Sequence, residues 1–298
     1  MSKVTIALGA LSISVLNKGR AAVPSVLLMI VLLGSLLLGS AINWVSVYLA
    51  MELQTLALFV LVALSTDNAY GAEGGLKYYV LGAVSTGLFL FGCALLYGTT
   101  GETGVQAVHL LGGGIAPLTF ITAALLFKLA AAPFHMWAPD VYEGAPTIVT
   151  ALLATVPKAA VFAILVQIGP VMHVVWFCAI LSMAYGSLGA LNQTRIKRLM
   201  AYSGIGHAGF MLFGIGIGSF SSMQASTVYL LVYMVMAVCS FAVILALYEP
   251  EGARGRPRRP LLAGLNGLST ANPVMAGTVA LVFFSIAGIP PLMGFLGK

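Results

Sequence analysis

The chain is 298 residues long, 60% of its residues are hydrophobic and only 7% are charged, and its mean hydropathy is +1.04. Since soluble domains carry about 25% charged residues, this composition excludes a water-soluble globular protein and indicates a multi-span membrane protein. The formal charge of +6 is concentrated in a few clusters, which is typical of a membrane topology signal and not of a nucleic-acid-binding surface.

The chain begins with residues 1–21, a segment whose apolar stretch covers only about a dozen residues, too few to cross a bilayer. We expect this segment to lie at the membrane interface. Longer apolar runs follow, and they predict about nine transmembrane helices over residues 22–41, 43–65, 77–98, 108–137, 146–168, 170–191, 199–218, 223–248 and 273–297. Because these runs lack the alternation of a membrane β-barrel, the predicted fold class is an all-α polytopic transmembrane helix bundle.

The basic loop residues all lie on one side of the membrane if the chain crosses it as predicted. That side holds Lys3, Lys18, Arg20, Lys77, Arg195, Lys197, Arg198, Arg254, Arg256, Arg258 and Arg259. The connections on the opposite side, including the one with Glu102, hold no lysine or arginine. Because basic loops stay on the cytoplasmic or matrix side, we assign the first side to that compartment.

Two of the predicted helices are interrupted by proline close to a lysine. Lys128 precedes Pro133, and Pro290 and Pro291 precede Lys298. Proline opens a helical turn, and lipid tolerates this only where protein or water lines the opened turn. An ordinary kink is one interpretation of each proline. The repeated pairing with a lysine favours functional breaks, which transporters use at their ion sites.

Glu52, Lys128 and Lys158 are ionisable residues in the middle of apolar runs. Lys128 lies about 13 Å along its helix from Trp137, and Lys158 lies about 18 Å from Pro146. Glu52 lies about 13 Å from the end of its own helix, so we expect similar depths for all three. A charge at mid-bilayer costs about 3 to 10 kcal/mol. This cost favours a proton relay, in which burial favours the neutral lysine and an approaching carboxylate favours the charged one; a structural ion pair is the alternative.

The remaining motifs give weaker signals. Cys93, Cys178 and Cys239 lie in apolar runs without a CxxC spacing, which argues against a disulfide framework or a metal site. The segment from Gly204 to Gly209 matches the dinucleotide-binding pattern GxGxxG. No predicted strand precedes it, so we interpret its glycines as helix-packing residues.

The four histidines are His109, His135, His173 and His207. Two of them could bind a haem iron, although nothing in their spacing favours it. His135 follows Pro133 by two residues and is a candidate proton shuttle; a histidine bonded to the carbonyls of the opened turn is the alternative. Asp140 and Glu143 are predicted in a polar loop on the basic side, where they orient the loop or collect protons.

Four segments of the chain are distinctive: YLAMELQTLALFVL, EGGLKYYVLGAVSTGLFLFGCALLYGTTG, FKLAAAPFHMWAPDVYEGAPTIVTALLATVPKAAVF and NQTRIKRLMAYSGIGHAGFMLFG. They strongly resemble the antiporter-like family in the proton-pumping membrane arm of respiratory complex I. The similarity runs from about residue 40 to the end. It implies two inverted five-helix repeats, each with a proline-broken helix: a first repeat over 22–168 and an incomplete second repeat over 169–298.

The resemblance also implies which residues move protons. Glu52, Lys128, Lys158 and Lys298 fall on the family positions for proton translocation, with His135 and Lys77, the latter at the start of its helix, as accessory candidates. The chain would be a core membrane subunit of proton-translocating NADH:ubiquinone oxidoreductase without redox catalysis, cofactor or metal of its own. NADH, FMN, iron–sulfur clusters and ubiquinone would bind to other subunits.

The implied partners are the other membrane-arm subunits and lipids such as cardiolipin, with no role for nucleic acid. The alternatives are a subunit of a related cation/proton antiporter or of photosynthetic complex I, or a scaffold subunit without pumping. Bacterial members begin with three further helices, and the shortened ends of this chain favour the mitochondrial inner membrane over a bacterial plasma membrane. Because the sequence stops at Lys298, within a predicted helix, we expect a separate polypeptide or a continuation to complete the second repeat.

Overall fold

The computed structural model describes residues 22–64, 69–106, 114–169, 171–248, 261–290 and 292–297. Within these ranges the regular secondary structure is helical, and extended pairing is limited to two isolated bridges, Asn43 with Gly104 and Arg195 with Leu261. The predicted all-α class is confirmed for this part of the chain. The predicted interfacial segment 1–21, the arginines between 254 and 259, and Lys298 lie outside the described residues.

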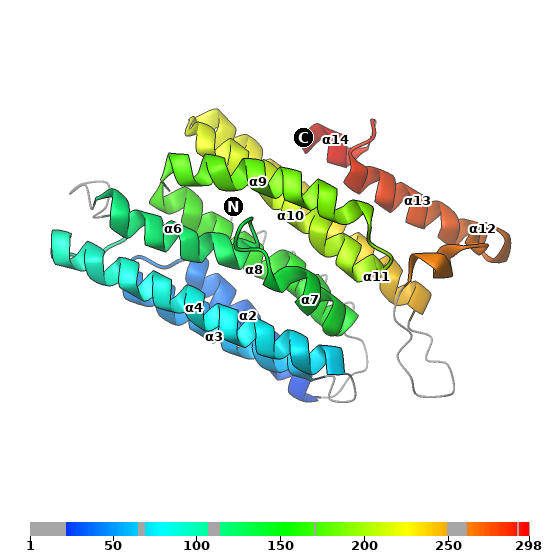
Figure 1. Cartoon of the computed structure of the whole chain (residues 1–298), viewed down its shortest axis with the longest axis horizontal. Coiled ribbons are helices and arrows are strands. Elements are labelled where there is room, and N and C mark those ends of the chain that lie inside the picture. The colour runs from blue at the N-terminus through cyan, green and yellow to red at the C-terminus, as the bar shows by residue number, and fades with distance from the viewer. Residues whose placement is uncertain are drawn as a thin grey trace.

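The helices run largely side by side along the long axis of the molecule (Figure 1). In chain order they are α2 (Ala22–Gly39), α3 (Trp44–Ala63), α4 (Ala69–Thr100), α6 (Ile115–Leu129), α7 (Trp137–Gly144), α8 (Thr147–Ile168), α9 (Met172–Leu191), α10 (Ile196–Ile217), α11 (Phe220–Tyr248), the 3₁₀ turn η1 (Leu262–Leu265), α12 (Leu268–Ala271), α13 (Pro273–Ala287) and α14 (Met293–Gly297).

Six helices in the described ranges are long and apolar enough to cross a membrane: α3, α4, α8, α9, α10 and α11. Three shorter apolar helices lie over Pro24–Leu38, Ile115–Leu129 and Pro273–Ala287, each inside one of the predicted runs. The structure therefore supports a polytopic helical membrane protein with six long spans. The finer prediction of about nine crossings arranged as inverted repeats stays a prediction.

Helix α8 is the centre of the bundle. In its most apolar window 94% of the residues are buried, against 28% for α4 and for α9. It contacts α2 and α3, the broken pair α6 and α7, and α10 and α11. A helix that is apolar on all sides, as α8 is, is stable only when other helices cover it completely. Lys158 is therefore held in the middle of the protein and away from the lipid.

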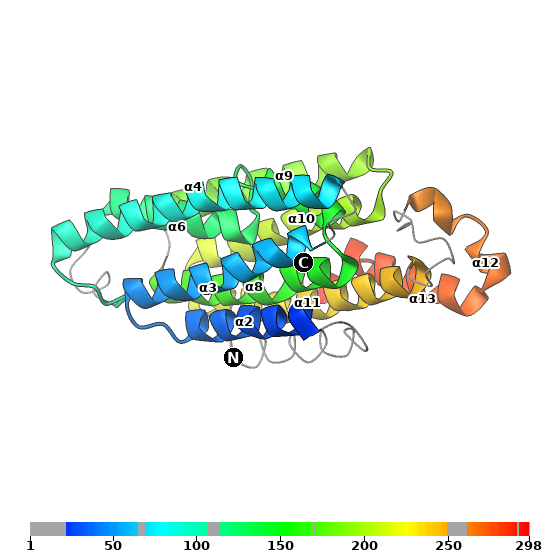
Figure 2. The same ribbon diagram turned by 90° about the horizontal axis from the view of Figure 1, so that it is seen from below.

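The remaining helices form two groups on either side of α8. One group joins α2, α3, α4 and α6 through the contacts of α2 with α3, α3 with α4, and α4 with α6. The other joins α9, α10 and α11, and α13 and α14 pack on α11. Figure 2 shows α12 and part of α13 at one end of the molecule, next to α11.

Both predicted helix breaks are present. α6 ends at Leu129, and Ala130 adopts a left-handed conformation with φ +61°. The chain re-enters a helix at Trp137. In the second break α13 ends at Ala287, Gly288 has φ +81°, and α14 begins at Met293. Left-handed residues at these ends let the cap amide bond to the last helical carbonyls, which stops the helix.

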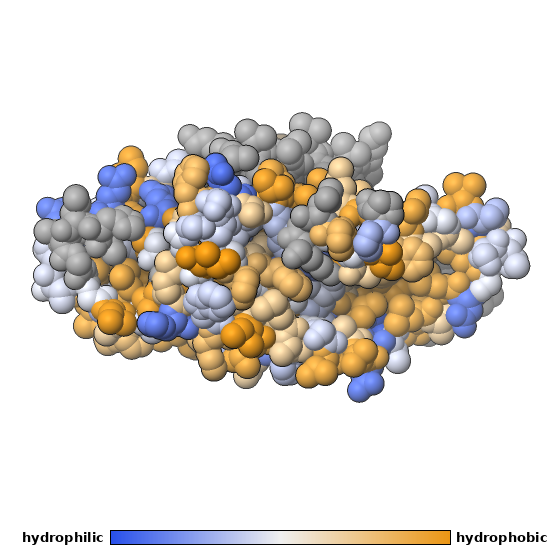
Figure 3. Space-filling model, turned by 90° about the horizontal axis from the view of Figure 1, so that it is seen from above, coloured by the Kyte–Doolittle hydropathy of each residue, from blue (hydrophilic) through white to orange (hydrophobic). Residues whose placement is uncertain are grey.

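Large apolar side chains cover much of the outer surface. Ile42, Leu188 and Leu76 are among them, with 76%, 68% and 64% of their surfaces exposed. Figure 3 shows apolar residues spread over much of one face of the molecule. Contiguous apolar surface of this kind marks a contact with lipid or with neighbouring proteins.

Candidate functional site

Lys128 is buried at the end of α6. Only 8% of its surface is exposed, and its Nζ donates a 2.8 Å hydrogen bond to Oγ1 of Thr55 on α3. The Thr55 hydroxyl in turn donates to the carbonyl of Met51 at 2.6 Å, so it both accepts and donates. Because Lys128 lies in the last turn of α6, its ammonium also faces the negative end of that helix dipole.

Glu52 lies one helical turn before Thr55, on the same side of α3. Its Oε1 accepts a 2.7 Å hydrogen bond from Oγ1 of Thr86 on α4. Glu52, Thr55 and Thr86 all line an open pocket of about 340 Å³ between α3 and α4. Thr86 and Thr55, which both line this pocket, thus bond to the carboxylate of Glu52 and the ammonium of Lys128, while the rest of the lining is largely apolar.

The α6–α7 break, residues 130–136, holds Lys128 in this place. The indole Nε1 of Trp137 donates to the carbonyl of Phe127 at 2.9 Å, and the amide of Ala131 donates to Leu126 at 3.0 Å. His135, which is 7% exposed, packs against Tyr185 of α9 with ring centroids 4.1 Å apart and ring planes tilted by 55°. The carbonyls opened by the break thus find donors within the protein, as lipid requires.

Lys158 occupies a different environment. It is 2% exposed, and its Nζ lies 5.9 Å from the ring centre of Tyr142 and 5.6 Å from that of Tyr233. Such distances allow a cation–π attraction between the ammonium and both rings. Pro157, directly before it inside α8, cannot donate to the carbonyl of Leu153 and leaves that acceptor without its helical partner.

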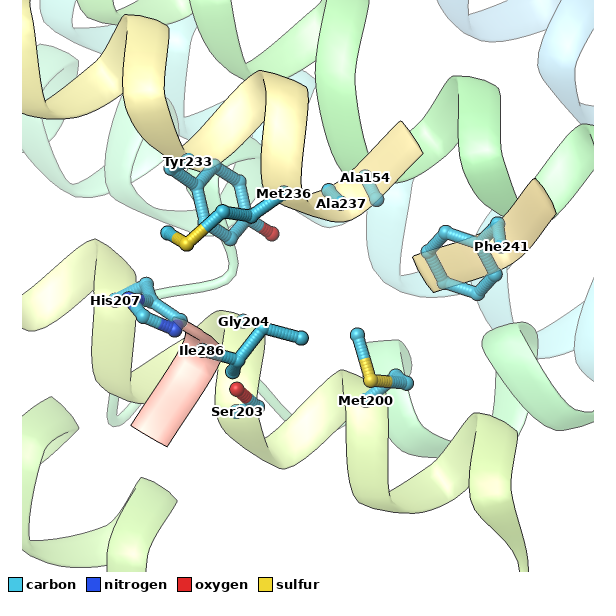
Figure 4. A pocket seen from close by; sticks show the side chains of 10 residues that line it. All are labelled: Ala154, Met200, Ser203, Gly204, His207, Tyr233, Met236, Ala237, Phe241 and Ile286. Atoms are coloured by element: carbon cyan, nitrogen blue, oxygen red, sulfur yellow. The ribbon is translucent and has the colours of Figure 1, made fainter. Parts of the chain in front are cut away.

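Gly204 of α10 makes room beside Lys158. A Cβ atom on Gly204 would lie 3.2 Å from the Lys158 Nζ and 3.0 Å from the Tyr233 hydroxyl. A cavity of about 10 Å³, enough for one water molecule, lies at this position. Figure 4 shows Ser203, His207 and Tyr233 around it, together with Ile286 from the last turn of α13.

His207 continues the polar groups from the cavity into α11. It is 5% exposed, and its Nδ1 lies 2.5 Å from the hydroxyl of Tyr229. Its ring also lies 5.2 Å from that of Tyr233. The cavity therefore extends from Gly204, which lies beside Lys158, to Ile286 at the end of α13, where the second break begins.

An ionic network joins α4, α7 and α10 on the side assigned as cytoplasmic or matrix. Lys77 pairs with Glu73 at 2.6 Å and with Asp140 at 2.7 Å. Arg198 bonds to Asp140 at 3.3 Å and to Glu143 at 3.2 Å, and Glu143 also pairs with Arg195. Lys197 donates to the carbonyl of Ala145 at 2.9 Å, just after α7.

This network corrects two predictions. Asp140 and Glu143 lie in α7, an eight-residue helix, and not in a loop, because the network fixes them and the helix resumes directly after the break. Lys77 lies in the third turn of α4 and not at the start of a helix, because α4 begins at Ala69, well before the apolar run. A hydrophobicity pattern does not place either helix start, because residues 69–76 mix apolar residues with three glycines and Glu73, and α7 mixes apolar residues with Asp140 and Glu143.

The structure brings some of the predicted residues together and separates others. Glu52 lines the pocket between α3 and α4, and Lys128 is joined to that pocket through its bond to Thr55. Lys158 lies apart from them, beside Gly204 and Tyr233, which line the cavity between α8, α10 and α11. Among the described residues no carboxylate forms an ion pair with Lys128 or Lys158. The alternative of a direct structural ion pair is therefore absent from this part of the chain.

Several polar residues in these sites were not predicted: Thr55, Thr86, Ser182, Tyr229 and Tyr233. Hydroxyl-bearing residues are common in membrane helices, so their presence alone gives no signal. For Thr55 a signal existed, because it follows Glu52 by three residues and shares its face of the helix.

The fold and these buried lysines can be compared with known proteins. The family model described as NADH:quinone oxidoreductase/Mrp antiporter, transmembrane, matches residues 41–298. NADH-ubiquinone oxidoreductase chain 2 of Metridium senile is 56% identical over 95% of this chain and 74% of its own length. NADH-quinone oxidoreductase subunit N 1 of Rhizobium meliloti is 44% identical over 99% of this chain and 66% of its own length.

Solved structures agree with these relatives. A chain in the structure of respiratory complex I from Thermus thermophilus with bound aureothin has a TM-score of 0.88 at 34% identity, covering 99% of this chain and 66% of that one. A chain of the Mrp complex from Dietzia sp. has a TM-score of 0.83 at 22% identity, which is a likeness of fold alone.

The chain therefore belongs to the NADH:quinone oxidoreductase/Mrp antiporter transmembrane family. Within this family it groups with the antiporter-like membrane subunits of complex I, NADH-ubiquinone oxidoreductase chain 2 and NADH-quinone oxidoreductase subunit N. The resemblance stated from the sequence segments is thereby confirmed. The chain spans 74% of the Metridium relative and 66% or less of several bacterial relatives.

Proposed function

We propose that the chain is a core membrane-arm subunit of a proton-translocating NADH:ubiquinone oxidoreductase and that it moves protons through Glu52, Lys128, Lys158 and Lys298. The observation that carries this proposal is the burial of two lysines, 8% and 2% exposed, without an ion-paired carboxylate in the described part of the chain. A buried charged lysine without an ion-pair partner costs free energy, and this cost disappears when the amine releases its proton and becomes neutral. Such a lysine is therefore suited to proton exchange.

Glu52 and Lys128 form the first half of the proposed relay. A hydroxyl can accept and donate at the same time, so Thr55 and Thr86 can relay protons between waters in the pocket and the two charged groups. The ionised Glu52 carboxylate favours the charged form of Lys128 when the two groups are near. When Glu52 is protonated and neutral, Lys128 releases its proton more readily. No redox centre is needed for such a step.

Lys158 forms the second half. Its ammonium can pass a proton to a water in the neighbouring cavity, from which His207 and Tyr229 lead towards the second break. Lys298 follows this break and is proposed as the exit residue by sequence position alone. Because two lysine charges in a low-dielectric interior repel each other, loading Lys128 favours the release of the proton from Lys158.

The accessory residues have distinct proposed roles. His135 lies in the α6–α7 break against Tyr185, where it can shuttle a proton to or from Lys128. Lys77 pairs with Asp140 and Glu73, and we propose that it holds α7 in place and does not carry protons itself.

The setting follows from the family. As a multi-pass membrane subunit similar to subunits from Metridium senile and from bacteria, the chain would lie in the mitochondrial inner membrane, with a bacterial plasma membrane as the alternative. Its partners are other membrane-arm subunits and lipids such as cardiolipin. NADH, FMN, iron–sulfur clusters and ubiquinone belong to other subunits, and the prediction that this chain binds no cofactor itself remains a prediction. The first repeat over 22–168 and the second over 169–298 are the proposed functional halves.

The decisive experiment replaces Lys158 by methionine in the assembled complex. Proton uptake into closed vesicles per NADH oxidised should fall at least about tenfold for this subunit's share of pumping, because a thioether carries no proton. NADH oxidation by an artificial acceptor should remain unchanged. Undiminished pumping by an assembled K158M complex would leave only a scaffold role. Purification without a flavin- and iron–sulfur-containing arm would instead favour a cation/proton antiporter.

A further inference from the structure

The α6–α7 break leaves backbone groups that the protein must satisfy. The amides of Ala130 and Ala131 turn back to Phe127 and Leu126, and the indole of Trp137 also donates to Phe127. Pro133 has no N–H group to donate. The amide of Ala132, directly before this proline, has no helical carbonyl to bond and points out of the break.

The hydroxyl oxygen of Ser182 on α9 accepts a hydrogen bond from this amide. Its Oγ lies 2.8 Å from the Ala132 nitrogen, and the same hydroxyl donates to the carbonyl of Cys178 at 2.6 Å. Ser182 is 0% exposed. The serine proton is thus committed to its own helix, and the lone pairs of its oxygen are directed at the break.

Other buried serines of the bundle do not make such a contact. Ser35 and Ser240 bond only to the carbonyl four residues before them, Val31 and Met236. Ser85 of α4 does reach α6, where it donates to the carbonyl of Ala124 at 3.0 Å, but that carbonyl already lies inside the helix. Among these four, Ser182 alone accepts a hydrogen bond from backbone outside its own helix, that of Ala132 in the break.

The position of this contact matters for Lys128. Lys128 lies four residues before Ala132, in the last turn of α6, and its Nζ must reach Thr55 across the bundle. If the Ala132 amide lost its acceptor, the break would have to rearrange to find another, because lipid and apolar side chains offer none. Such a rearrangement moves the end of α6 and with it the Lys128 ammonium.

We propose that Ser182 is a positioning residue for proton transfer, which fixes the α6–α7 break and thereby holds Lys128 on Thr55. The structural part of this inference stands alone, and its effect on pumping rests on the proposed function. Ser182 touches no transferred proton itself. Its hydroxyl, and not its size, is the feature that matters.

The test compares two variants of nearly equal shape in the assembled complex, S182T, which keeps the hydroxyl, and S182V, which replaces it by a methyl group. S187V is the matched control, because Ser187 lies on the same helix but bonds only to Met183 and Ala184 at the exposed side. Two quantities are measured: hydrogen exchange of the peptide that contains Ala132, and the pH profile of proton pumping per NADH oxidised.

We expect S182T and S187V to match the unmodified complex. In S182V the backbone amide hydrogens around Ala132 should exchange at least about fivefold faster, because a buried amide has lost its acceptor. The pH of half-maximal pumping should also shift. Equal exchange rates or equal pH profiles in S182V and S182T would overturn the proposal.

Two further outcomes are informative. If S182V fails to assemble, S182A takes its place; if neither hydroxyl-free variant assembles while S182T does, the hydroxyl serves folding and the positioning role is refuted. The proposed function is tested separately from the Ser182 contact, by K128M, and normal pumping by K128M would contradict it. In that case faster exchange in S182V would still establish the contact between Ser182 and the break.

Discussion

Lys128 and Lys158 are both buried ammonium groups, but their surroundings differ in kind. Lys128 has a fixed hydroxyl partner, Thr55, which itself lines a pocket of about 340 Å³. Lys158 lies near two tyrosine rings, one of which, that of Tyr233, lines a cavity of about 10 Å³. A large open pocket suits exchange with several waters, whereas a cavity for one water suits transfer in a defined direction. The two lysines are therefore not interchangeable steps of one relay.

The largest effect that separates the two sites is expected from G204A. The new methyl group would crowd both the Lys158 Nζ, at 3.2 Å, and the Tyr233 hydroxyl, at 3.0 Å. Proton pumping should fall about tenfold or more, because the transferring groups are displaced. The acidification of closed vesicles measures this loss of pumping.

The matched control for this variant is G206A. A Cβ at Gly206 of the same helix meets nothing within 4 Å, so G206A should assemble and pump normally. Normal pumping by G204A would show that the cavity is not on the proton path and that Lys158 uses another route.

An intermediate effect is expected from T55V at the Lys128 site. The valine keeps the shape of Thr55 but leaves the Lys128 ammonium without its hydrogen-bond partner, a loss of about 1–3 kcal/mol. Pumping should fall several-fold and recover in T55S, which restores the hydroxyl. If T55V and T55S behave alike, water in the pocket already replaces the hydroxyl and the contrast between the two sites weakens.

The smallest effects are expected in the ionic network that supports α7. The Asp140 side chain is 28% exposed and that of its partner Lys77 is 41% exposed, so D140N should cost only about 0.5–1 kcal/mol of stability. The Glu143 side chain is 7% exposed and pairs with two arginines, so E143Q should cost more. Thermal unfolding of the purified complex at low and high salt measures both; a larger loss in D140N than in E143Q would contradict this ranking.

The sequence predicted the all-helical class and both helix breaks. Lipid requires every spanning segment to be long and apolar, and it tolerates a proline break only where polar groups satisfy the opened backbone. Glu52, Lys128 and Lys158 were found for the same reason, since a charge in an apolar run is rare. Ser182 and Thr86 could not be found this way. Their importance depends on which neighbouring helix they face, and the sequence of one helix does not contain that information.

The glycines of α10 show the same limit. The interpretation as helix-packing residues fits Gly209, where an added Cβ would lie 2.8 Å from the carbonyl of Ala179 on α9. It does not fit Gly204, which faces Lys158 and Tyr233 and creates space for water and not for a backbone. Two glycines of one motif thus have opposite uses, which only the tertiary structure separates.

Ala130 has a consequence for how the first break can behave. It adopts a left-handed conformation although it is not glycine, at a cost of about 1–2 kcal/mol that the surrounding contacts must outweigh. A glycine would adopt this conformation without that cost, whereas an alanine favours the right-handed and extended regions. The left-handed turn between α6 and α7 is therefore imposed by the surrounding contacts and not by the preference of the residue itself, so a change that loosens those contacts would release this turn first.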